Sequence, residues 1–383
     1  MKDSNPLGAA RDLHGEIRAL APRIEQDRRL PPDLMSRFTE AGFFRLVVPR
    51  ALGGLEADLH TTLEVIEEVS RADGSTGWTV MIGSITAVLS GWLEPAVAEQ
   101  IYTRDAFTGG VAAPLGQAHV SEGGYRVTGR WPFASGCQHA SWLVGGAVIF
   151  EGGAPQMRGP VPLTRMFLFP ASEVRIHDTW HVSGLCGTGS HDMEVPGVTV
   201  SHERSVSFLM DRPRQPGPLY AFPAWSLLAL GVAAVLLGIA RGAVDEAERV
   251  AREKTPLGSK VKLAAKPSAQ AKVAEAEATL RAARAFLHDA VDRCWALVEP
   301  GREAPLTTRA ELRLAATHAA SSAIRAVDLA YHVVGTTSIH DASPLQRAFR
   351  DVHAGAQHAI LGPDVVELAG AVLLGVDADT SRF

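Results

Sequence analysis

The segment Gly129–Trp142, GRWPFASGCQHASW, places two tryptophans, a phenylalanine, small residues and hydrogen-bonding groups close together in the chain. If the segment is extended, Trp131 and Phe133 lie on one face, and a flat ligand can approach the backbone closely at Ser135 and Gly136. A core strand whose serine bonds its own backbone would have the same composition. The segment alone therefore leaves a binding site and a plain β-strand as equal alternatives.

Two further stretches favour a binding site. Trp180–Asp192, WHVSGLCGTGSHD, repeats the mixture of tryptophan, glycine and hydroxyl groups. Pro344–His358, PLQRAFRDVHAGAQH, adds two histidines and an arginine–aspartate pair, Arg350 and Asp351. We expect this pair to form an ion pair that fixes the last helix and its preceding loop. His353 lies roughly 140° around a helix from the second histidine, which argues against a metal site.

The hydrophobic pattern divides the chain into three parts and predicts an α+β fold. Residues 1–106 and 223–383 have helical periodicity, whereas residues 107–222 alternate and are rich in glycine and proline, which indicates a β domain. Long helices with short loops in the last part predict an antiparallel four-helix bundle. The predicted helices span Leu7–Asp27, Pro32–Ala41, Leu59–Arg71, Gly77–Leu93, Pro95–Thr103, Trp225–Glu253, Lys262–Val298, Thr307–Val334 and Pro344–Leu374.

Composition and charge narrow the class of protein. A net charge of -5 and a pI near 6.3 argue against nucleic-acid binding and favour a small-molecule partner. Trp225–Ala240 carries no charge, but it is shorter than the roughly 20 residues of a membrane span, so we interpret it as a core helix. Three widely spaced cysteines, Cys137, Cys186 and Cys294, fit neither a disulfide framework nor a zinc cluster, so we expect a cytoplasmic protein without a bound metal.

The order of helices, β domain and helix bundle, together with the three stretches, resembles the acyl-CoA dehydrogenase superfamily. Within it, the chain is most similar to the two-component flavin-dependent monooxygenases, which receive reduced flavin from a separate reductase. Their F-S-S-G pattern with a nearby histidine is met at Phe133–Gly136 and His139. Their G-x-x-G-T-G-S pattern is met at Gly184–Ser190, and R-D-x-x-A-x-x-x-H at Arg350–His358.

The chain also departs from this pattern. Ala134 replaces the first serine of F-S-S-G, and Cys186 occupies a position that is often arginine in the family. The helix Gly77–Leu93 lacks the histidine with which some relatives bind phenols. The resemblance therefore does not extend to that phenol-binding arrangement.

The resemblance implies reduced FMN or FAD as cofactor and molecular oxygen as co-substrate. It places Ser135 at flavin N5, where a hydroxyl in a dry pocket helps a C4a-hydroperoxide to survive. Each further cofactor contact has a structural role as its alternative, either a core aromatic, a plain turn or a solvated helix end. These contacts are Trp131, Phe133, Gly136 and Trp180 around the ring, Thr188, Gly189 and Ser190 at the phosphate or ribityl group, and Lys254 at a phosphate.

The resemblance also places His358, on the last long helix, beside the reacting centre. A neutral imidazole there can accept the proton of a bound phenol. The other expected substrate contacts are Trp78, Ser84 and His139. We expect Ser135 and His358 to face each other across one cavity that holds the flavin ring and the substrate.

These residues imply an oxygenase that hydroxylates an aromatic or polycyclic molecule. In many acyl-CoA dehydrogenases a glutamate acts as the base, but its place is taken here by Ala359, and Asp245 and Glu246 on the first bundle helix are weak substitutes. Dehydrogenation of a thioester, N-oxygenation of an amine and a non-catalytic binding role remain the alternatives. The family also implies a homotetramer, which the alanine-rich faces of the bundle support.

Overall fold

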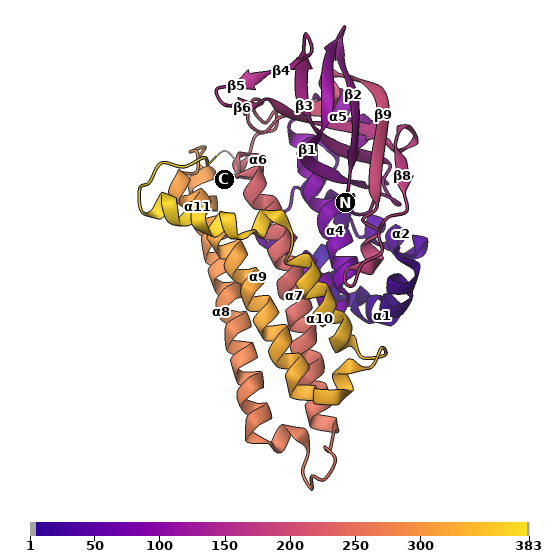
Figure 1. Ribbon diagram of the computed structural model, residues 1–383, viewed down its shortest axis with the longest axis vertical. Helices are drawn as coiled ribbons and strands as arrows, with labels where there is room; N and C mark the ends of the chain where they lie inside the picture. Colours follow the sequence, from indigo (N-terminus) through magenta and orange to yellow (C-terminus); the bar gives the residue numbers. More distant parts are fainter. Residues whose placement is uncertain (1–4, 381–382) are drawn as a thin grey trace.

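A β-sheet lies at one end of the molecule, and long helices extend away from it, with the N-terminal helices beside their junction (Figure 1). The computed structural model describes residues 5–380 and residue 383. Helices occupy the chain up to Ile101, strands occupy Thr108 to Val206, and long helices follow from Ala224. The predicted order of the three parts is therefore present in the described chain.

Prolines and aspartates start the N-terminal helices. Pro6, Pro32 and Pro95 stand at the first helical position, where the missing N–H costs nothing. Asp73 ends one helix and caps the next by accepting the backbone N–H of Thr76, so only a sharp turn separates the two helices. The helices are α1 (Pro6–Asp27), α2 (Pro32–Glu40), α3 (Leu59–Ala72), α4 (Gly74–Thr86) and α5 (Pro95–Ile101).

The main sheet has the strand order β10-β7-β3-β1-β2-β9-β8. β1 and β2 form a hairpin, with Gly123 at a φ of +74° in its turn, and β1 and β3 are parallel. The strands are β1 (Thr108–Ser121), β2 (Gly124–Trp131), β3 (Trp142–Glu151), β4 (Ala154–Pro155), β7 (Thr164–Pro170), β8 (Arg175–His177), β9 (Asp192–Ser201) and β10 (Ser205–Val206), and β5 (Met157–Arg158) pairs with β6 (Val161–Pro162) in a separate ribbon.

The segment Gly129–Trp142 is not extended along its length. β2 ends at Trp131 and β3 begins at Trp142, and the residues between them form a loop. Trp131 is fully buried in the core of the sheet, whereas Phe133 is 65% exposed. The prediction that these two aromatic side chains share one face is therefore wrong.

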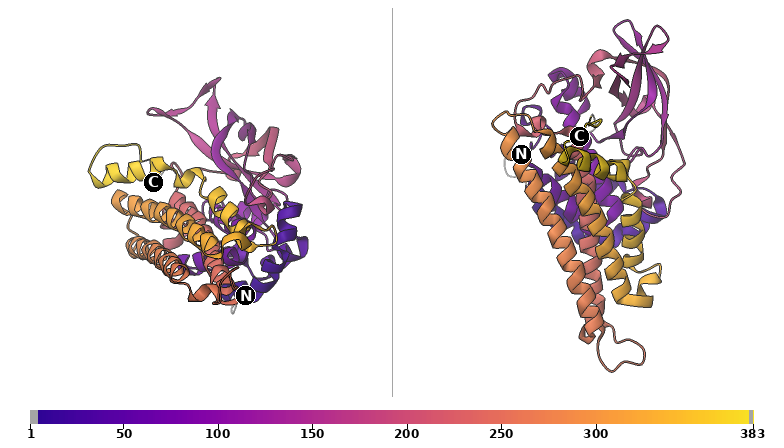
Figure 2. Two further views of the ribbon diagram at one scale, coloured as in Figure 1. Left: turned by 60° about the horizontal axis from the view of Figure 1, so that its bottom comes forward. Right: turned by 60° about the vertical axis from the view of Figure 1, so that its left-hand side comes forward.

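Three long helices lie side by side and extend away from the sheet, and a shorter fourth one packs against two of them (Figure 2). The fourth predicted helix, Pro344–Leu374, is broken after Gly355, because Pro363 has no N–H to donate and disfavours helix at the residue before it. His358 therefore lies in the break and not on a long helix. The helices are α6 (Pro218–Ala221), α7 (Ala224–Glu253), α8 (Pro267–Val298), α9 (Leu306–Val334), α10 (Pro344–Gly355) and α11 (Pro363–Leu373).

The N-terminal helices and the bundle share one hydrophobic core, and the sheet has its own. α7 is long and apolar enough for a membrane span, but 83% of its most apolar window is buried inside the protein, as expected of a core helix. α3 packs closely on it at Gly238, where an added Cβ would lie 2.3 Å from the carbonyl oxygen of Glu67.

The close contact at Gly238 and the open surroundings of Gly15 predict opposite effects for two glycine-to-alanine changes within helices. Gly238→Ala should destabilise the protein by about 1–3 kcal/mol, because α3 and α7 must move apart. Gly15→Ala, at an exposed position of α1 with no neighbouring atom within 4 Å, should stabilise it by about 0.5–1 kcal/mol through helix propensity. Urea unfolding of both variants measures these free energies, and equal effects would contradict the close α3–α7 contact.

Candidate active site

Two loops of the β domain interlock at the junction with the helices. The backbone N–H of Ala134 donates to His191 and that of Gly136 to Thr188, so the loop 132–141 lies along the loop 178–191. Gly136 has a φ of +70°, and an added Cβ there would lie 2.6 Å from the ring of Phe107. This position therefore requires glycine for its conformation and for space.

A chain of hydrogen-bonded side chains crosses these loops. The indole Nε1–H of Trp78, on α4, donates to Ser135 Oγ at 3.0 Å. Ser135 Oγ lies 2.7 Å from Ser190 Oγ, which in turn lies 2.7 Å from Thr188 Oγ1. Thr188 donates to the carbonyl oxygen of Leu185 at 2.8 Å. The four side chains are all buried.

The end of this chain fixes the direction of every proton in it. Because a carbonyl only accepts, Thr188 uses its proton on Leu185, so Ser190 donates to Thr188 and Ser135 donates to Ser190. Ser135 also accepts the N–H of Trp78. One lone pair of Ser135 Oγ is left, and the hydroxyl can therefore only accept a further hydrogen bond.

His358 and Ser135 both contact Trp78. The rings of Trp78 and His358 have centroids 5.8 Å apart and are tilted by 48°. Both Ser135 and His358 thus contact the same indole, and their meeting across one open cavity stays a prediction.

The surroundings of His358 keep its imidazole neutral. Its Nδ1 accepts the backbone N–H of Ile360 at 3.2 Å, which places the proton of the neutral ring on Nε2. Burial, with a smaller effect from Arg313, lowers the pKa of His358 to about 4. In this arrangement His358 is a hydrogen-bond donor through Nε2 and not the proton acceptor that the sequence suggested.

Phe133 presents an exposed aromatic face next to Ser135. Its backbone has a φ of +66°, an unusual conformation for a residue with a side chain, and its ring contacts the edge of Trp180 with centroids 5.8 Å apart. Strained residues and exposed aromatics are concentrated at functional sites. A planar ring that carries an N–H donor, such as reduced flavin, fits a surface with an aromatic face and an acceptor hydroxyl.

Three expected site residues have other surroundings. Trp131 is buried in the sheet and donates its indole N–H to Gly146, so it cannot reach a cofactor. Ser84 is buried inside α4 and bonds backbone carbonyls, so it cannot bind substrate. Lys254 donates to Val334 and Thr337 at the end of the bundle away from the sheet, where it joins α7 to the end of α9.

His139 lines a separate open cavity of about 560 Å³ beside α2. Burial, with a smaller effect from Arg29, lowers the pKa of His139 to about 4. Phe107 lies at this cavity and also packs against Gly136. His139 thus lines a different part of the structure from the contacts of Trp78 with Ser135 and His358.

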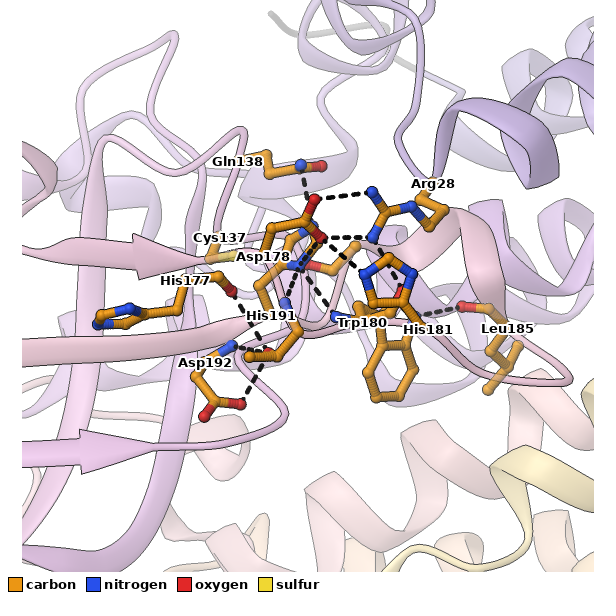
Figure 3. Close-up of polar contacts among 12 residues, drawn as sticks. Arg28, Cys137, Gln138, His177, Asp178, Trp180, His181, Leu185, His191 and Asp192 are labelled. Atoms are coloured by element: carbon orange, nitrogen blue, oxygen red, sulfur yellow. Dashed lines mark hydrogen bonds and ion pairs between the residues drawn. The ribbon is translucent and has the colours of Figure 1, made fainter.

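The sequence did not reveal the polar contacts that fix the loop 178–191 from outside (Figure 3). Arg28, at the end of α1, donates both terminal nitrogens to Asp178. The imidazole Nδ1 of His191 accepts the backbone N–H groups of Thr179 and Trp180. Only the position of His191 directly after the GTGS motif hinted at such a role.

The described site has no carboxylate where a dehydrogenase base would stand. Ala359 follows His358 directly. Asp245 is paired with Arg71 and Arg241, and Glu246 with Arg18 and Arg249. Both carboxylates of α7 are therefore committed to ion pairs, which disfavours thioester dehydrogenation.

The lowered pKa of His358 predicts a loss of stability in acid. The unfolded chain has the higher histidine pKa of 6.5, so it takes up protons first as the pH falls below about 6.5. The loss of unfolding free energy should reach about 2 kcal/mol at pH 5, and the variant His358→Gln should not show it. Unfolding free energies of the two proteins between pH 5 and 8 measure it, and a difference that does not vary with pH would refute the buried neutral imidazole.

Known proteins resemble this chain over almost its whole length. The family models "Acyl-CoA dehydrogenase, N-terminal domain" and "Acyl-CoA dehydrogenase, C-terminal domain" match residues 9–100 and 230–363. An indole-3-acetate monooxygenase of Pseudomonas putida is 35% identical over 94% of this chain and 90% of its own. The flavin-dependent monooxygenase oxygenase subunit HsaA of Rhodococcus jostii is 34% identical over 91% of this chain and 92% of its own.

A solved structure has the same fold. XiaF from Streptomyces sp., in complex with FADH2 and glycerol, superposes with a TM-score of 0.91 at 25% identity, covering 98% of this chain and 96% of that one. The family predicted from the three motifs is thus confirmed. The chain belongs to the acyl-CoA dehydrogenase superfamily and, within it, to the oxygenase subunits of the flavin-dependent monooxygenases.

Proposed function

We propose that this protein uses reduced FMN or FAD and molecular oxygen to hydroxylate an aromatic small molecule. The observation that carries the proposal is the hydroxyl of Ser135, which can only accept a hydrogen bond and stands two residues after the exposed Phe133 in the same loop. Reduced flavin has a donor at N5, whereas oxidised flavin has an acceptor there. The site therefore suits the reduced form.

In this proposal, Phe133 and Trp180 contact the flavin ring and Ser135 accepts the N5–H. The bound reduced flavin supplies the activation of oxygen. Thr188 and Ser190 act through Ser135, because their hydroxyls are already engaged in the chain of hydrogen bonds. Gly136 and Gly189 are closely packed, since an added Cβ at either would lie 2.6 Å from a neighbouring side chain, so we assign neither to the flavin ring. We place no flavin phosphate at Lys254 of the same chain, since its amine is bonded within the bundle.

The substrate is placed on the side of Trp78 and His358. An indole face and an imidazole Nε2–H suit an aromatic ring that carries an oxygen acceptor, such as a carboxylate, a hydroxyl or a carbonyl group. The relatives that act on indole-3-acetate support an aromatic substrate of this kind. An amine N-oxygenase would gain nothing from a donor at this position.

Reduced flavin would come from a separate reductase, as the name "oxygenase subunit" implies for the relative from Rhodococcus jostii. We further propose a cytoplasmic homotetramer. The buried alanines along α8 and α9 support close helix packing, but they act within one subunit. Sedimentation of the purified protein determines the number of subunits.

The test supplies the purified protein with photoreduced FMN or FAD, ¹⁸O₂ and indole-3-acetate or a phenol. Mass spectrometry should find one ¹⁸O atom per product molecule. Ser135→Ala should lower the product formed per oxygen consumed by about tenfold and raise hydrogen peroxide, because the acceptor hydroxyl is lost. Ser141→Ala, at the end of the same loop, serves as the matched control. Release of all the oxygen as peroxide by the unchanged protein, with every substrate in a panel of aromatic molecules, would overturn the proposal.

A further inference from the structure

The arginine–aspartate pair of α10 does not form the ion pair that the sequence suggested. Arg350 bonds the carboxylate of Glu25 and the carbonyl oxygen of Ser183. Asp351 points into the protein, is 3% exposed and accepts the backbone N–H of Leu185 at 2.6 Å. Arg350 and Asp351 thus bind two nearby backbone groups of the loop 178–191, the carbonyl oxygen of Ser183 and the N–H of Leu185.

Leu185 links these contacts of α10 to the active site. Its φ is +53°, a left-handed conformation that is strained for a residue other than glycine and persists only where the surroundings fix it. Its carbonyl oxygen accepts both the indole N–H of Trp180 (Figure 3) and the hydroxyl of Thr188. Asp351 fixes the other side of the same residue, so the N–H and the carbonyl oxygen of Leu185 are both held.

We propose that Asp351 is a positioning residue of the active site, which holds Leu185 in its left-handed conformation and thereby directs the hydroxyl of Ser135. The link runs from Leu185 through Thr188 and Ser190, whose protons all point the same way. If Leu185 changes conformation, Thr188 loses its acceptor and the direction of the chain is no longer fixed. This inference rests on the proposed role of Ser135 toward reduced flavin.

The packing around α10 couples the same helix to the other half of the site. An added Cβ at Gly184 would lie 2.2 Å from the carbonyl oxygen of Arg350, so the loop touches the helix backbone. Gly355, at the end of α10, faces Trp78 and Leu185, with an added Cβ 3.3 Å and 3.4 Å from their side chains. His358 follows shortly after. α10 therefore positions the loop 178–191 through Asp351, and it positions the imidazole of His358 through its C-terminal end.

The charge of Asp351 depends on its surroundings. Burial, then the neighbouring carboxylate of Asp73, raises the pKa of Asp351 to about 7, while Leu185, Arg347 and Arg350 act in the opposite direction. Arg347 lies 3.8 Å from Asp73 and 3.5 Å from Glu25. Protonation leaves an oxygen that still accepts from Leu185, but a neutral acceptor is weaker than a carboxylate. The grip on Leu185 should therefore tighten as the pH rises through about 7.

Variants on α10 and three measurements test the positioning role. Asp351→Ala removes the acceptor, Asp351→Asn keeps one, and His353→Ala on the same helix, whose imidazole bonds Asp328 instead, is the control. Amide hydrogen exchange of the peptide 184–190 is measured without flavin, so it does not depend on the proposed reaction. The dissociation constant of reduced flavin and the product formed per oxygen consumed are measured next.

Asp351→Ala should raise the exchange rate of the peptide and the dissociation constant by about tenfold each, and Asp351→Asn should stay within about threefold of the unchanged protein at every pH. Asp351→Ala combined with Ser135→Ala should lose no more product than the worse single variant, because both break one chain. Unchanged exchange in Asp351→Ala, failure of Asp351→Asn to restore it, or additive losses would overturn the inference. A protein that shows the exchange effect but hydroxylates nothing would overturn only the proposed function.

Discussion

The direction of one hydroxyl proton governs the active site. The chain of hydrogen bonds from Trp78 to Leu185 ends at a carbonyl, so the proton of Ser135 points to Ser190. The hydroxyl then offers only a lone pair to whatever lies on Phe133. An isolated serine at the same place would rotate freely and offer a donor as readily as an acceptor. The neighbouring hydroxyls thus convert a versatile group into a selective one, and in the function proposed above this selectivity favours a flavin whose N5 carries hydrogen.

The fold supplies this chain from distant parts of the sequence. α4 contributes the indole, two loops of the sheet contribute the hydroxyls, and α10 holds the loop at Leu185. None of these contacts is local, so each depends on the packing of the sheet against the helices. The N-terminal helices and the bundle share one core, in which α3 and α7 approach closely at glycines. This close packing makes the helical support of the sheet rigid.

The sequence predicted the fold because the fold rests on local patterns, and the roles of Ser135 and His358 stay predictions from motifs of the same kind. Helical and alternating periodicity, proline and glycine positions and three short motifs are all visible in one dimension. The surroundings of each residue were less predictable. Trp131 and Phe133 lie two residues apart, yet a left-handed φ at Phe133 sends one ring to the core and the other to the surface. Pro363 already indicates a break in the helix. The prediction of one helix over Pro344–Leu374 did not allow for this proline, and it placed His358 on a helix that in fact ends at Gly355.

The neutrality of the site explains how one fold separates oxygenation from dehydrogenation. Removal of a proton from carbon needs a strong base beside the flavin, and the described site offers no free carboxylate there: Ala359 stands at that position, and the carboxylates of α7 are held in ion pairs. His358 is a weak base, because burial disfavours its charged form. What remains is a set of buried hydrogen-bond donors and acceptors with fixed directions. Such groups orient a substrate and exclude water without removing protons, which is what the transfer of an oxygen atom from a water-sensitive reagent requires.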